Sequence, residues 1–207
     1  DNYYADAALT EGNLKIVTSS GAYTYITGTI GLSAGKWFWE VKCVADTTNG
    51  GTYGNGEDMI GITGQQSRAN HDFNGTYEFF YNPYARFYDG SSGNQFDSYG
   101  ATWGTGDIIG VALDLDSGTN TIQFYKNGSA QGSKNITNVS STPNGFYIPA
   151  WGEYTSGASS TQQVNFGNPT FAISSGNADG NGYGNFEYSV PSGFYSICTK
   201  NLAEHGG

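Results

Sequence analysis

Residues 36–45 read Lys-Trp-Phe-Trp-Glu-Val-Lys-Cys-Val-Ala. Side chains of a β-strand alternate between the two faces of its sheet, so this stretch separates into two sets. One face carries the apolar side chains Trp37, Trp39, Val41 and Cys43. The other face carries the charged side chains Lys36, Glu40 and Lys42. The pattern predicts a strand whose ring-bearing face lies in a hydrophobic core.

Strand signals of the same kind recur along the chain, separated by breaks rich in Gly, Asn, Ser and Thr. They cover residues 14–18, 23–30, 58–63, 76–81, 84–89, 107–115, 120–126, 146–151 and 162–166. Turn sequences at 116–119 and at Asn127-Gly128 predict tight hairpins around residues 120–126. No window of useful length has the spacing of an amphipathic helix. We therefore expect an all-β protein, an antiparallel two-sheet β-sandwich.

A chain of 207 residues suits one core. Residues 174–185 have almost nothing to bury, and the apolar segment 194–198 follows them. We therefore expect a sandwich over residues 1–171, and a Gly/Asn-rich loop with a final strand packing back on it over 172–203. Residues 204–207 are interpreted as a tail or linker.

The acidic balance argues against some partners. The formal net charge is −10, with 18 Asp and Glu against 8 Lys and Arg, so a nucleic acid would be repelled. No apolar run is long enough for membrane insertion, and the start does not resemble a signal peptide. We expect a soluble chain cut from a longer one. Cys43 and Cys198 are interpreted as two buried thiols, although the sequence leaves open whether they pair.

Several blocks of the sequence, in this order, resemble a SPRY (B30.2-type) domain. They are residues 35–41, 60–62, 106–116, 122–128, 146–150 and 164–167. The resemblance implies a bent sandwich of the concanavalin-like jelly-roll kind, whose variable loops bind a partner. It also implies a recognition module without catalytic residues, and most characterised members bind proteins or peptides. His71 and His205 are isolated from any Cys/His/Asp cluster and no phosphate loop appears, so we expect no metal and no cofactor.

The C-terminal stretch carries a second resemblance. Residues 176–186, 191–194 and 198–202 are similar to a tail found in SPRY-bearing structural proteins of bacteriophages, although Ala203 stands where that tail usually has proline. This implies a place on the virion surface, in a tail fibre or capsid decoration that belongs to a larger oligomeric assembly. Its partner would be a host surface glycan or protein, or another virion subunit, and we expect a glycan.

Aromatic and amide side chains suit sugar recognition, because rings stack on pyranoses while amides and guanidinium groups bind hydroxyls. Trp103 lies in a glycine-containing loop that lacks the alternating pattern of a strand, and we expect its ring to be exposed. The predicted ligand-binding residues are Trp103, Tyr81, Tyr84, Arg86, Asn82 and Tyr154. The alternative is that these rings fill the ends of the sandwich.

Two further alternatives involve carboxylates. Glu78 and Glu153 loosely imitate the two motifs of jelly-roll xylanases, whose retaining members hold two carboxyl groups about 5–5.5 Å apart. That alternative is a glycan hydrolase. Residues 177–188 begin like a calcium loop, but the twelfth position, which requires Glu, is Tyr188, so an ordinary turn is favoured.

Overall fold

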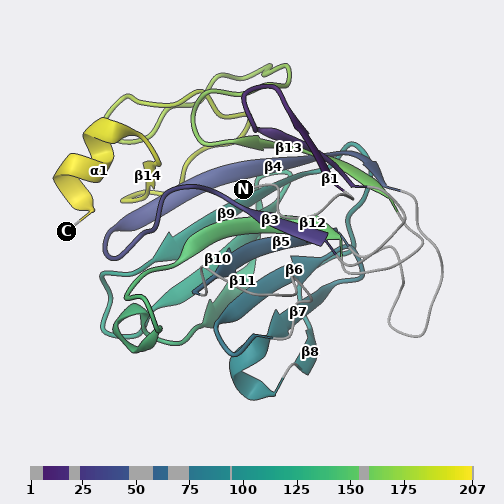
Figure 1. Cartoon of the computed structure of the whole chain (residues 1–207). Helices are drawn as coiled ribbons and strands as arrows, with labels where there is room; N and C mark the ends of the chain where they lie inside the picture. The colour runs from purple at the N-terminus through teal and green to yellow at the C-terminus, as the bar shows by residue number, and fades with distance from the viewer. Residues whose placement is uncertain are drawn as a thin grey trace.

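The computed structural model describes residues 7–18, 24–46, 58–64, 75–93, 95–153 and 159–206. Two sheets pack face to face, which confirms the predicted β-sandwich (Figure 1). In spatial order the first sheet contains β1 (Ala7–Thr10), β2 (Lys15–Thr18), β13 (Ser160–Asn165), β4 (Lys36–Asp46), β9 (Ile108–Asp114), β10 (Thr121–Lys126) and β11 (Ser129–Asn135). The second contains β3 (Thr24–Thr27), β12 (Ile148–Glu153), β5 (Asp58–Thr63), β6 (Glu78–Asn82), β7 (Arg86–Asp89) and β8 (Gln95–Ser98).

The ring-bearing face of β4 lies in the core, as its alternation predicts. Trp37, Trp39, Val41 and Cys43 are fully buried within the main hydrophobic cluster. Strand β4 lies between β13 and β9, in the middle of its sheet. Burial of such large side chains is the main favourable contribution to folding.

The two predicted hairpin turns have the expected geometry. Asn127 and Gly128 join β10 to β11 with φ angles of 47° and 78°, as a type I′ turn requires. Between β9 and β10, the Asp114 carboxylate accepts the N–H groups of Asp116 and Ser117, each at 3.0 Å. Short polar side chains therefore direct both reversals of the chain.

Some elements have no clear signal in the sequence. Strands β8 and β11 are largely exposed and polar, so apolar alternation cannot mark them. Two short 3₁₀ helices, η1 (Gly90–Ser92) and η2 (Val139–Ser141), occupy connections between strands. The last described element is helix α1 (Thr199–His205), which includes Glu204 and His205. Among the described residues, no helix has the length and apolar character needed to cross a membrane.

The outer face of β4 is covered by the C-terminal segment, residues 172–206 (yellow-green to yellow in Figure 1). Its two-residue strand β14 (Tyr195–Ser196) pairs in parallel with the start of β4. Phe38 packs edge-on against Phe186 with their ring centroids 5.3 Å apart. Glu40 is fully buried beneath the same segment. Strand β4 is therefore buried on both faces from Trp37 to Val41.

Asp179 holds the C-terminal segment in its own fold. One carboxylate oxygen accepts the N–H groups of Asn181 and Tyr183, and the other accepts from Ser196 and Asn201. Burial disfavours the charged form, but these hydrogen bonds outweigh it and hold the pKa of Asp179 below its usual value. Gly182 N–H also donates to Asp179 O at 3.0 Å, which closes a turn at this place.

We predict that Asp179→Asn lowers the free energy of unfolding by about 2–3 kcal/mol, because an amide cannot satisfy the same set of buried donors. Urea unfolding measures the loss. The exposed Asp97, paired with Lys134 at 3.6 Å, offers a matched control, and Asp97→Asn should change little. Since the folded pKa is lowered, the stabilisation by Asp179 is present above pH about 4 and disappears as the pH falls through the folded pKa. An unchanged urea midpoint in Asp179→Asn contradicts this role.

Candidate functional site

Trp103 is buried, so the prediction of an exposed ring is wrong. Its side chain is only 5% exposed. The loop folds back onto the turn between β6 and β7, where Trp103 N–H donates to Pro83 O at 3.1 Å and Tyr99 N–H donates to Ala85 O at 2.7 Å. The sequence could not show these long-range contacts. Trp103 belongs to the core, as the alternative of rings filling the sandwich predicted.

Tyr81 is likewise buried in the core. Its ring lies 5.2 Å from Tyr99, 6.0 Å from Trp103 and 5.3 Å from Phe124, centroid to centroid. Its hydroxyl donates to the carbonyl of Ala101. Neither the face nor the hydroxyl of this ring is available to a sugar, so an exposed ligand-binding role for Tyr81 is also wrong.

Asn82 has a structural task at the turn between β6 and β7. Its side chain is fully buried, and its Oδ1 accepts the N–H groups of Tyr84 and Arg86 at 3.1 and 3.2 Å. Tyr84 and Arg86 are half-buried, and their ligand-binding role stays a prediction. Tyr154 lies outside the described residues.

Glu78 and Glu153 lie at opposite ends of β5. Glu78 pairs with Thr63, the last residue of β5, and Glu153 pairs with Asp58, the first. Five residues of strand separate these positions by about 17 Å. Both side chains are fully buried, and Glu78 accepts the N–H of Gly75 at 2.9 Å. The two carboxylates are not brought together, so the predicted hydrolase pair is wrong.

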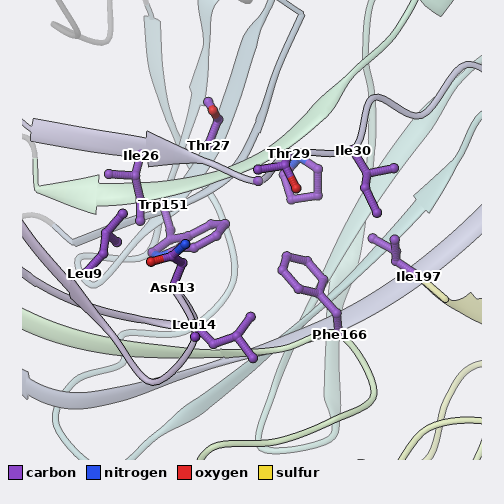
Figure 2. A pocket seen from close by; sticks show the side chains of 13 residues that line it. Leu9, Asn13, Leu14, Ile26, Thr27, Thr29, Ile30, Trp151, Phe166 and Ile197 are labelled. Atoms are coloured by element: carbon purple, nitrogen blue, oxygen red, sulfur yellow. The ribbon is translucent and has the colours of Figure 1, made fainter. Parts of the chain in front are cut away.

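A cavity of about 210 Å³ lies between the turn joining β1 to β2 and the edge formed by β3 and β12 (Figure 2). Trp151 of β12 and Phe166, just after β13, contact each other on its wall, with ring centroids 6.1 Å apart. Ile30 also lines the cavity, and it is one of the most exposed large apolar side chains among the described residues, at 40%. We call this cavity the groove.

The side chains that line the groove are apolar or uncharged. They are Leu9, Asn13, Leu14, Ile26, Thr27, Thr29, Ile30, Pro149, Trp151, Phe166 and Ile197, together with the backbone of Gly12 and Gly28. The Nε1–H of Trp151 is buried and has no hydrogen-bond partner among the described residues. The groove therefore offers apolar contact, and its lining residues supply no acid, base or nucleophile.

A second hollow of about 230 Å³ adjoins the groove and shares Leu14, Phe166 and Ile197 with it. Its other lining residues include Ser196 and Cys198 of the C-terminal segment. Cys43 and Cys198 are both free, and Cys198 is only half-buried. The docked C-terminal segment thus extends the apolar surface beyond the groove.

The groove was missed in the sequence because its residues come from segments far apart in the chain. Residues 9–14, 26–30, 149–151, 166 and 197 meet only after both sheets have formed. Taken alone, each of these segments resembles an ordinary core strand or an ordinary loop. The unusual exposure of Ile30 becomes visible only in the folded chain.

The fold is a two-sheet β-sandwich with an apolar groove beside β3 and β12. A family model of the SPRY domain matches residues 36–169, and the chain belongs to the SPRY domain family. SPRY domains are typically protein–protein interaction modules and are generally non-catalytic.

Solved structures support the same fold. The SPRY domain of human HERC1 has a TM-score of 0.57 and 19% identity, covering 76% of this chain and 91% of its own. Another human SPRY domain has a TM-score of 0.57 and 20% identity, covering 77% and 94%. A comparison with the curated proteins finds no match.

We predict that Trp103→Ala lowers the free energy of unfolding by about 3–5 kcal/mol, because it leaves a cavity beside Tyr81. Chemical denaturation followed by far-UV circular dichroism measures the loss. Trp103→Phe keeps most of the ring contact and should cost less. If Trp103→Ala unfolds at the same denaturant concentration as the wild type, Trp103 is not part of the core.

Proposed function

We propose that this SPRY domain is a non-catalytic recognition module that binds a protein partner by taking an apolar side chain into the groove. The observation that carries the proposal is the open cavity beside Trp151 and Phe166, which is lined without a single charge. An aliphatic or aromatic side chain gives up no hydrogen bonds to water when it enters such a groove. Burial of its apolar area then favours binding.

A peptide segment is the favoured ligand, because SPRY domains are typically protein–protein interaction modules. The net charge of −10 further favours a partner with basic residues around its apolar anchor.

A glycan partner has less support from the described residues. The rings expected to stack on sugars at Trp103 and Tyr81 are buried, and the groove contains no charged hydrogen-bonding group. We further propose that the module is displayed on a phage or virus-like particle, where its partner is a host surface protein or another virion subunit. The support for this setting is the resemblance of residues 176–202 to phage structural proteins.

The test is selection from a random 12-residue peptide display library on the purified chain, followed by titration of the selected peptide. We expect sequences with one large apolar residue flanked by Lys or Arg. Gly28 lines the groove, and a Cβ added there would stand 3.7 Å from Pro149 O, which is ordinary contact. Gly28→Leu should therefore fold, fill the groove and weaken binding at least tenfold.

Two further variants distinguish binding in the groove from nonspecific binding to exposed apolar side chains. Ile30→Ser removes an apolar side chain from the groove, and Val44→Ser removes one of similar exposure, 36%, from β4 outside it. Ile30→Ser should weaken binding several-fold, and Val44→Ser should bind like the wild type. Peptide binding that survives Gly28→Leu in a folded protein contradicts the groove as the site. Binding to a bacterial glycan array with no peptide selected would favour the glycan alternative.

A further inference from the structure

Strand β3 forms one edge of the second sheet, because among the described strands it pairs with β12 alone. The N–H of Gly28, just after β3, donates to Pro149 O at 2.8 Å, so the backbone of Gly28 faces β12. Backbone groups along an antiparallel strand point alternately to its two sides. Ile26 therefore also faces β12, whereas the N–H and C=O groups of Thr27 face away from it. No strand in the described part of the chain pairs with Thr27 on that side.

The groove lies along this stretch of the chain (Figure 2). Five consecutive residues, 26–30, line it, whereas β1 contributes only Leu9. Exposure increases along the five, from the buried Ile26 to Ile30, which is 40% exposed. Ile26 stands directly opposite Trp151 of β12, so the two side chains share one face of the sheet. A segment laid along β3 would therefore meet backbone groups and the apolar wall together.

The edge at β3 lacks the features that usually keep edge strands from pairing with another chain. Charged side chains, proline and bulges serve that purpose in most sheets. The edge strands β8 and β11 carry charges, Asp97 and Lys134, which pair with each other at 3.6 Å. Residues 24–30 read Thr-Tyr-Ile-Thr-Gly-Thr-Ile and contain neither a charged residue nor a proline. Such an edge is a template for an added strand.

Charge indicates what kind of strand would be added. A second copy of the chain would bring another net charge of −10, so repulsion opposes the pairing of two β3 edges. Glu11 is exposed in the turn between β1 and β2, next to Gly12 and Asn13, which line the groove. No ion pair among the described residues involves Glu11. A segment with Lys or Arg complements this charge.

We propose that a peptide segment of the partner protein binds as an additional antiparallel strand on the free edge of β3, with an apolar side chain in the groove and a Lys or Arg near Glu11. This inference rests on the proposed function and specifies how the peptide lies. All pairs of described strands in the second sheet are antiparallel. Main-chain hydrogen bonds would supply affinity, and the groove would select the apolar anchor.

The alternation of β3 determines which peptide residues bond to it. A peptide residue opposite Ile26 directs its side chain to the same face as Ile26 and Trp151, and so into the groove. Its own N–H and C=O point away from β3, as those of Ile26 do. The peptide residues before and after this anchor lie opposite Thr27 and Tyr25 and exchange hydrogen bonds with their backbones.

The test is N-methylation, one amide at a time, of the peptide selected from the 12-residue display library, titrated against the purified chain. Methylation of the residue before or after the apolar anchor removes a hydrogen bond and places a methyl group against β3. Its Kd should rise about tenfold or more. Methylation of the anchor itself should change Kd little, because that amide faces away from β3. Affinity should therefore alternate with a period of two along the peptide.

Variants of the chain test the other side of the same hydrogen bonds. Thr27→Pro removes an N–H that faces the free edge, where proline is tolerated, so the variant should fold and bind about tenfold more weakly. Thr27→Val keeps the N–H and serves as the matched control, which should bind like the wild type. Glu11→Gln should weaken binding several-fold at low salt and little at high salt, because salt screens an exposed charge.

The outcomes separate the added strand from the groove itself. A peptide that Gly28→Leu displaces, but whose N-methyl series shows no alternation, overturns the added strand and leaves the groove as the binding site. A loss at the amide of the anchor and not at its neighbours overturns the antiparallel pairing in the same way. If the library yields no peptide that depends on the groove, the proposed function and the added strand both fail. If Thr27→Pro does not fold, the N-methyl series decides, because it leaves the chain unchanged.

Discussion

Glu40 carries a buried carboxylate on the outer face of β4, where it accepts the N–H groups of Glu187 and Tyr188 at 3.0 and 2.9 Å. Burial raises the pKa of Glu40, and those two donors, with the Asn165 amide at 3.2 Å, offset only part of the desolvation. Removal of the C-terminal segment would take two donors from Glu40 and expose the apolar surface around Phe38. The C-terminal segment, which forms a layer over the outer face of β4, is therefore part of the fold.

The groove depends on the same docking. Asn165 binds both Glu40 and the carbonyl of Asn185, and the next residue, Phe166, lines the groove. Ile197 follows β14, the short strand that pairs with β4, and lines the groove from the other direction. A contact on the outer face of one sheet thus positions two of the side chains that a ligand would meet. The binding surface is a product of three layers, although the family fold has two sheets.

The sequence shows the fold well where one face of a strand is apolar, as in β4, and where polar side chains dictate a turn, as at Asn127. It fails where burial depends on a distant segment. Glu40 looks like a solvent-facing residue until the C-terminal segment covers it. Trp103 looks like a loop residue until its loop folds onto Pro83. Edge strands such as β8 pair through their backbones and need no apolar pattern.

The groove was out of reach for a related reason, since it is built from residues that only the pairing of strands brings together. Trp151 and Glu153 share one face of β12 and stand opposite Ile60 and Asp58 of β5. The interior of the sandwich therefore changes along this one pair of strands from an apolar surface beside the groove to a polar end with carboxylates. Apolar burial stabilises the first part, whereas in the second part burial raises the pKa of Asp58 to about 7.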